Sequence, residues 1–232
     1  MIDKDQIARN AGVVTQTVAD AARMAGRAPR EVTIVAVSKT MPIECVEAAY
    51  IAGMRHFGEN RVQEAEGKIG KVVLEGVSWH LIGHLQTNKA RTATRIFDVI
   101  QSVDSIRVAE SLSREAIRLD RQLDVLLEVN ISGEQSKFGM STIETPDLAA
   151  RIAGLNHLRL IGLMTIAPFV EDPEEARPFF REMRLLSDQV RTIVGHPELW
   201  HLSMGMSNDY SVAIDEGATI VRIGRAIFGE RA

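Results

Sequence analysis

The chain has 232 residues, 45% hydrophobic and 25% charged, and its 27 basic and 31 acidic side chains leave a formal net charge of −4. This composition is that of a globular protein, and the near balance of charge without a basic run argues against nucleic acid as a partner. No apolar stretch is long enough to span a membrane and no basic and apolar leader opens the chain, so we expect a cytoplasmic protein. Its single cysteine, Cys45, excludes an internal disulfide and a multi-cysteine metal site, so we expect no bound metal.

Helical and extended patterns alternate along the whole chain. Apolar residues from Ile7 to Ala21 recur every three or four positions and stop at Gly26, which predicts an amphipathic N-terminal helix. Later helices are predicted over 42–53, 62–74, 87–95 and 174–194, the last with the clearest apolar stripe. Apolar runs predict strands at 32–37, 56–60, 77–83, 98–102, 123–130, 158–165, 199–203 and 219–223.

Eight strands that alternate with helices imply a parallel sheet buried on both faces. We therefore predict one domain over residues 1–232, an α/β protein folded as a single (β/α)₈ TIM barrel with an extra N-terminal helix. A doubly wound open sheet is the alternative. It would usually carry a Gly-x-Gly-x-x-Gly turn after its first strand, and the sequence has none there.

In a parallel barrel the ligand site lies at the carboxyl ends of the strands. Polar residues stand at these positions in strand order: Lys39, Glu59 and Asn60, His84, Ser102 and Asp104, Asn130, Thr165, Ser203, and Arg222 with Gly224. Strand ends are often polar for solvation alone, so each of these residues has both a functional and a structural reading.

Lys39 closes the first strand on the face that also carries Val35 and Val37, which points into a barrel. Partial loss of solvent around a lysine disfavours the ammonium and leaves a nucleophilic amine, as a Schiff base requires. Position alone nevertheless favours the simpler reading, a lysine that reaches out to solvent from the strand end.

Two glycine-containing loops, 203–207 and 222–226, follow the last two predicted strands, where barrels often bind phosphate. Small residues there let backbone N–H groups at a helix start approach an anion, although each glycine also suits a tight turn. Arg222 lies within an apolar run and needs an acceptor inside the barrel, either a carboxylate or a ligand atom.

Several segments together resemble the pyridoxal 5′-phosphate homeostasis protein family. They are Val-Ala-Val-Ser-Lys-Thr at 35–40, Phe-Gly-Glu-Asn-Arg-Val-Gln-Glu at 57–64, Trp-His-Leu-Ile-Gly-His-Leu-Gln-Thr-Asn-Lys at 79–89, Ser-Lys-Phe-Gly-Met at 136–140, Gly-Leu-Met-Thr at 162–165, Leu-Ser-Met-Gly-Met-Ser at 202–207 and Val-Arg-Ile-Gly-Arg-Ala-Ile-Phe-Gly at 221–229. The resemblance covers nearly the whole chain, and the segment at 79–89 is its most specific part. It implies the barrel of alanine racemase without that enzyme's second, β-rich domain, the class known as fold type III of enzymes that use pyridoxal 5′-phosphate (PLP).

The same resemblance implies a set of cofactor-binding residues: Lys39, Asn60, Ser203, Met204, Arg222, Gly224 and Arg225. Lys39 would form the Schiff base with PLP, against the reading from its position alone. Ser203, Gly224 and Arg225 would surround the phosphate, Arg222 would face the pyridine nitrogen, and Asn60 and Met204 would border the ring. Many relatives have threonine at Arg225, so only the backbone N–H of this residue carries over. The role of Lys137, a second family lysine, stays open.

The resemblance implies a monomer that holds PLP reversibly and takes part in PLP homeostasis and in amino-acid and keto-acid balance, with apo PLP enzymes as recipients. We expect no enzymatic turnover and assign no catalytic residue. A PLP-dependent amino-acid racemase of low activity is the alternative, and a phosphosugar-binding barrel without PLP is a third reading.

Overall fold

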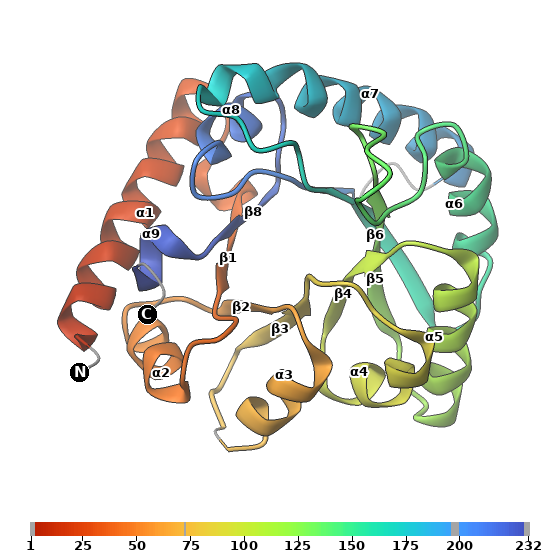
Figure 1. Cartoon of the computed structure of the whole chain (residues 1–232), viewed down its shortest axis with the longest axis horizontal. Coiled ribbons are helices and arrows are strands. Elements are labelled where there is room, and N and C mark those ends of the chain that lie inside the picture. Colours follow the sequence, from red (N-terminus) through yellow and green to blue (C-terminus); the bar gives the residue numbers. More distant parts are fainter. Residues whose placement is uncertain (1–2, 72, 196–199, 230–232) are drawn as a thin grey trace.

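The computed structural model describes residues 3–71, 73–195 and 200–229. Its eight strands form one closed barrel in sequence order, and every pairing between neighbouring strands is parallel. The predicted barrel is thus confirmed and the open sheet is wrong, because β1 pairs with β8 and leaves no edge (Figure 1). The strands are β1 Thr33–Val37, β2 His56–Glu59, β3 Ser78–Leu81, β4 Val99–Val103, β5 Leu123–Val129, β6 Leu158–Thr165, β7 His201–Ser203 and β8 Ile220–Ile223.

The helices surround the barrel: α1 Lys4–Met24, α2 Ile43–Ile51, α3 Val62–Ile69, α4 Ala90–Ile96, α5 Ile106–Arg118, α6 Thr145–Ala153, α7 Arg177–Val194, α8 Tyr210–Asp215 and α9 Arg225–Phe228. The extra N-terminal helix α1 packs across α2, α8 and α9 (Figure 1). It begins where the Asp3 side chain accepts a hydrogen bond from the backbone N–H of Gln6 and so caps the first turn.

Several element ends differ from the sequence-based prediction. The predicted helix over 62–74 ends at Ile69, since Gly70 forms the C-cap and its N–H donates to the carbonyl of Glu66. The predicted helices over 87–95 and 174–194 each begin with a 3₁₀ turn, Thr87–Lys89 and Pro173–Ala176. The seventh strand begins at His201, and Leu199, at the start of its predicted range, lies outside the described residues.

Strand alternation divides the buried residues between two cores. The larger core, called the outer core below, lies between strands and helices and includes Ala36, Phe57 and Leu127. Val35 and Leu126 belong to a small apolar cluster inside the barrel. The inside of the barrel is also polar, because His80, Gln101, Glu128, Ser203 and Arg222 are buried there at strand positions that alternate with the outer core. A polar interior needs internal hydrogen-bond partners.

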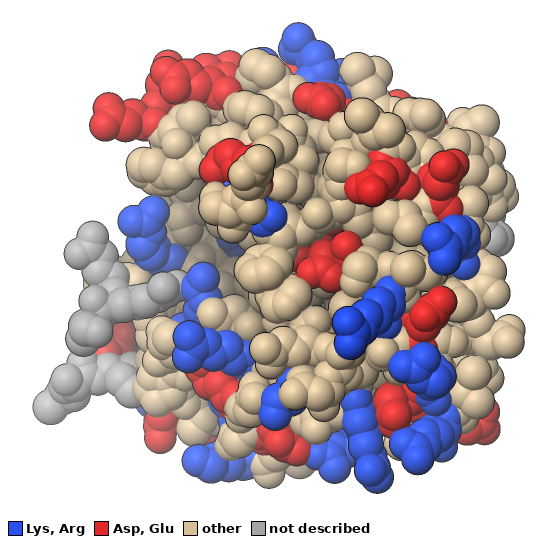
Figure 2. Space-filling model, turned by 45° about the vertical axis from the view of Figure 1, so that its right-hand side comes forward, with Lys and Arg blue, Asp and Glu red and all other residues tan. Residues whose placement is uncertain are grey.

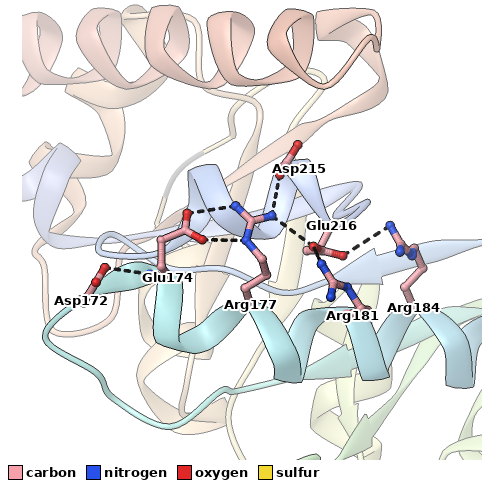
Figure 3. Close-up of polar contacts among 7 residues, drawn as sticks. All are labelled: Asp172, Glu174, Arg177, Arg181, Arg184, Asp215 and Glu216. Carbon is pink, nitrogen blue, oxygen red and sulfur yellow. Dashed lines mark hydrogen bonds and ion pairs between the residues drawn. The ribbon is translucent and has the colours of Figure 1, made fainter.

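An ion network joins α7 to the end of α8 (Figure 3). The carboxylate of Glu216, whose side chain is 5% exposed, lies within 3.4 Å of guanidinium nitrogens of Arg177, Arg181 and Arg184. Arg177 also contacts Asp215 and Glu174. Burial alone would raise the pKa of Glu216, but the arginines lower it overall, so the carboxylate stays ionised.

Basic and acidic side chains are interspersed over the face shown in Figure 2, in keeping with the near balance of charge in the sequence. None of the helices in the described ranges is long and apolar enough to cross a membrane.

Candidate functional site

An open cavity of about 370 Å³ lies at the carboxyl ends of the strands. It brings together five of the residues expected to bind the cofactor: Lys39, Asn60, Arg222, Gly224 and Arg225. The other lining residues are Val37, Ile82, Gly83, Ile166, Pro168, Phe169, Val170, Met206, Ser207, Asn208 and Asp209. Segments that follow six different strands therefore meet at one site, as the barrel topology requires.

Lys39 stands half-buried at the end of β1, above a buried ionic cluster. The Lys68 ammonium of α3 donates to the carbonyl of Ser38 at 2.9 Å and to Glu59 Oε1 at 2.6 Å, and the Ser38 hydroxyl donates to the same oxygen at 2.7 Å. Burial raises the pKa of Glu59, while its hydrogen bonds with Lys68 and Ser38 oppose that shift. The cluster anchors the chain directly before Lys39, and the sequence patterns did not single out Lys68.

The chain turns sharply immediately after Lys39. Thr40 has a φ of 64°, a left-handed conformation that is unfavourable for a β-branched residue. Its backbone N–H donates to Glu64 of α3, which holds the turn in place. A residue held in such a conformation by surrounding contacts is typical of functional sites.

Arg222 is 4% exposed and extends from β8 inside the barrel to the cavity. Its Nη1 donates to the Ser203 hydroxyl and its Nη2 to the carbonyl of Thr165, both at 2.7 Å. Its acceptors within the barrel are thus a hydroxyl and a carbonyl, and the described residues give it no ion pair. Burial lowers the pKa of Arg222 to about 10, while Asp209 and Glu128 act in the opposite direction, so the guanidinium remains charged at neutral pH.

Two predicted site residues, Ser203 and Met204, do not line the cavity in the described part of the chain. The Ser203 hydroxyl is buried and donates to Gln101 Oε1 at 2.6 Å while it accepts from Arg222. Met204 is fully buried in the outer core. Their contacts with the phosphate and the ring therefore stay predictions from the resemblance.

The loop after β7 presents its next residues to the cavity instead. Gly205 has a φ of 90°, and a Cβ there would lie 2.6 Å from the Cβ of Ala213, so only glycine fits. Asp209 is buried, and its Oδ1 accepts the backbone N–H of Met206 at 2.6 Å. Ser207 and Asn208 line the cavity within this closed turn. The motif at 202–207 includes Ser207, but the sequence analysis did not choose it because only the fold shows which loop positions face inward.

Gly224 and Arg225 form the other predicted phosphate loop. Gly224 is the N-cap of the short helix α9, and a Cβ added to it would lie 3.4 Å from the carbonyl oxygen of Val37. The first N–H groups of a helix have no partner within that helix, so they are donors for a ligand. Both residues line the cavity, and the Arg225 side chain itself is exposed.

Asn60 is positioned by the close approach of Gly83. A Cβ at Gly83 would lie 2.4 Å from the Asn60 carbonyl oxygen, which excludes any larger residue. The Asn60 Oδ1 atom is buried and has no hydrogen-bond partner among the described residues. A ligand donor in the cavity would satisfy it.

Lys137 lies outside the cavity, beside a neighbouring pocket. Its ammonium pairs with Glu134 at 2.7 Å. The same pocket contains His84, whose ring stacks on Phe138 at 4.0 Å and whose Nδ1 lies 2.9 Å from Asp104 Oδ2.

The fold and the cavity define a ligand-binding (β/α)₈ barrel with one lysine amine and one buried guanidinium at the mouth. The family described as alanine racemase, N-terminal domain, matches residues 2–232. Proteins named pyridoxal phosphate homeostasis protein in Aquifex aeolicus (strain VF5) and Escherichia coli (strain K12) are 40% and 42% identical to the chain, over 94% and 98% of it and 95% and 97% of their own lengths. The chain belongs to the pyridoxal phosphate homeostasis protein family, within that broader racemase-related group, so the resemblance is confirmed.

Solved structures agree with this placement. PipY of Synechococcus elongatus PCC7942 with PLP bound is 37% identical, with a TM-score of 0.80 over 91% of this chain and 100% of that one. The alanine racemase of Corynebacterium glutamicum superposes with a TM-score of 0.74 at 19% identity, and the match covers 63% of the racemase. At that identity the likeness shows a shared fold.

Proposed function

We propose that this protein binds PLP through Lys39 and takes part in controlling the level or delivery of the cofactor, and hence amino-acid and keto-acid balance. The observation that carries the proposal is the meeting of Lys39, Arg222 and the α9 helix start in one cavity of a chain whose relative PipY has been solved with PLP bound. The protein acts as a monomer in the cytoplasm, with apo PLP enzymes as recipients.

The cavity matches the chemistry of PLP group by group. Lys39 would hold the cofactor's aldehyde through its primary amine. The backbone at Gly224 and Arg225 supplies N–H donors for the phosphate. Arg222 has five N–H groups, of which two are used inside the barrel, so it has donors left for the pyridine nitrogen. When bound, PLP supplies an electron sink for carbanion chemistry.

Two features of the chain support binding without turnover. An arginine opposite the pyridine nitrogen cannot accept a proton from the ring and favours the unprotonated, weaker electron sink. A two-base racemisation also needs a second proton-transfer group, and neither tyrosine lines the cavity: Tyr50 donates to the carbonyl of Glu75, and Tyr210 packs against the outer core. The low-activity racemase is therefore the weaker alternative.

Borohydride reduction tests the binding mode. Purified protein incubated with PLP is reduced and digested, and the pyridoxyl group is mapped on the peptides by mass spectrometry. We expect the label on Lys39 and its loss in Lys39→Ala, with the melting temperature of the PLP-free protein nearly unchanged. Lys137→Ala is the matched control and should keep the label. A label on Lys137 in the wild type would overturn the choice of lysine.

Delivery needs a separate experiment. Holo-protein is mixed with an apo PLP enzyme in the presence of a trap for free PLP, and the activity of that enzyme is followed. Activation faster than from the same amount of free PLP supports delivery by direct transfer. If the apo enzyme is activated no more than by free PLP in the presence of the trap, the role of the protein is restricted to storage of the cofactor.

A further inference from the structure

A continuous chain of hydrogen bonds crosses the barrel interior from β2 to the cavity. His56 Nδ1 lies 3.0 Å from His80 Nε2, and His80 Nδ1 lies 2.9 Å from Gln101 Nε2. Gln101 Oε1 accepts the Ser203 hydroxyl at 2.6 Å, and Ser203 Oγ accepts Arg222 Nη1 at 2.7 Å. Five side chains from β2, β3, β4, β7 and β8 thus form one line that ends at the guanidinium in the cavity.

Because Arg222 can only donate, it determines which atom donates and which accepts in every hydrogen bond of this chain of contacts. A guanidinium only donates, so Ser203 Oγ must accept from it and direct its own proton to the Gln101 carbonyl oxygen. The amide nitrogen of Gln101 then faces His80 and donates to an unprotonated Nδ1, so His80 carries its proton on Nε2 and donates to His56. The reverse orientation of the Gln101 amide would leave the Ser203 hydroxyl proton without an acceptor in the described part of the structure.

Burial supports the assignment of His80 as a neutral imidazole. His80 is 3% exposed, and burial, followed by the neighbouring His56 and His201, lowers its pKa to about 3. A neutral imidazole has one donor and one acceptor nitrogen, which is what the line requires at this position. Gln101 is fully buried, so solvent cannot replace either of its partners.

We propose that Gln101, held in orientation by His80, is the positioning residue that aims the Arg222 guanidinium at the ring nitrogen of the bound cofactor. The inference rests on the proposed PLP function for the identity of the ligand. It concerns Gln101 and His80, which do not line the cavity and to which the family resemblance gives no role. Ser203 acts in this arrangement as the link between Gln101 and Arg222.

The first test uses the protein without PLP. Nitrogen-15 NMR of labelled histidines at pH 7 should show His80 with its proton on Nε2 and with an unprotonated, hydrogen-bonded Nδ1. In Gln101→Glu, a carboxylate replaces the amide donor, so His80 Nδ1 should become protonated and donate to it. A wild-type His80 that carries its proton on Nδ1 would overturn the proposal even if PLP binds at Lys39.

The second test measures PLP binding. Gln101→Leu removes both hydrogen bonds and should weaken PLP affinity about tenfold or more, the size expected for a lost hydrogen bond to a charged group. It should also shift the absorption maximum of the bound cofactor, since the contact to its ring nitrogen changes. Gln101→Glu keeps an acceptor for Ser203 and should recover most of the affinity. It also serves as the folded variant if Gln101→Leu lowers the melting temperature too far for binding measurements.

His201→Asn is the matched control, because His201 is close enough to His80 to influence its pKa but contacts Thr219 instead of the line. It should bind PLP with wild-type affinity and spectrum. A folded Gln101→Leu with unchanged affinity and spectrum, or equal losses in His201→Asn, would refute the positioning role. Failure of the wild type to bind PLP would overturn the proposed function. The NMR result would still decide which nitrogen of His80 carries the proton, and so which atoms donate along the chain of hydrogen bonds.

Discussion

Glu128 offers a quantitative test of the polar barrel interior. The side chain lies on β5, is 6% exposed, and has an Oε2 atom without a hydrogen-bond partner among the described residues. Burial, and then repulsion from Asp104, raises its pKa from 4.5 to about 7, against the attraction of Arg222. We predict that Glu128→Gln, which keeps the shape of the side chain but removes its charge, stabilises the protein at alkaline pH.

The sign and size of the effect follow from proton linkage. Between pH 4.5 and 7 the folded wild type holds a proton on Glu128 that the unfolded chain has released, so the contribution of this group to stability falls as the pH rises. At about 1.4 kcal/mol per pH unit, this range corresponds to about 3 kcal/mol. The Gln side chain does not titrate, so the stability of this variant relative to the wild type should rise by about 2.5 kcal/mol from pH 5 to pH 8, since part of the change lies below pH 5.

Urea unfolding of the PLP-free proteins at pH 5, 6, 7 and 8 measures this difference. Glu110→Gln, at an exposed position on α5, is the matched control and should run parallel to the wild type. Wild-type and Glu128→Gln stabilities that keep a constant difference over this range would refute the argument, since a normally titrating carboxylate would then occupy the site.

Three further predictions concern the cavity and the helix layer. Gly224→Val adds bulk in the predicted phosphate loop and should weaken PLP binding more than Ser203→Ala. Pyridoxal, which lacks the phosphate, should bind poorly. Equal binding of PLP and pyridoxal in a titration would contradict the phosphate site. Holo-protein incubated with L-alanine in deuterated water should show only a trace of α-hydrogen exchange and D-isomer, because loss of a positioned proton-transfer group costs about 10²- to 10⁴-fold; sustained turnover that disappears in Lys39→Ala would instead support the racemase. Glu216→Ala should lower the free energy of unfolding by about 1 to 2 kcal/mol, since three partly exposed arginines lose their shared carboxylate, and an unchanged urea midpoint would show that the network in Figure 3 adds no stability.

Much of the site was predictable because the fold is regular. Alternation of strands and helices predicted eight parallel strands, and the carboxyl ends of such strands converge on one face. The strand ends are therefore where a site is expected, and Lys39, Asn60, Arg222 and Gly224, identified there from the sequence, lie in one cavity, whereas Asp104 and Asn130, which directly follow β4 and β5, do not line it. The resemblance supplied the chemistry of that cavity, which position alone had not decided for Lys39.

The sequence by itself thus determined the order of the elements, the barrel and the residues at the strand ends. Only the tertiary structure decided what the buried polar side chains contact. Ser203 and Gln101 are 102 positions apart, and Lys68 and Ser38 are 30 apart, yet each pair is joined by a buried hydrogen bond. Period-two alternation shows which face of the sheet a residue occupies, but its partner across the barrel depends on register and curvature, which are set by the packing of all eight strands together.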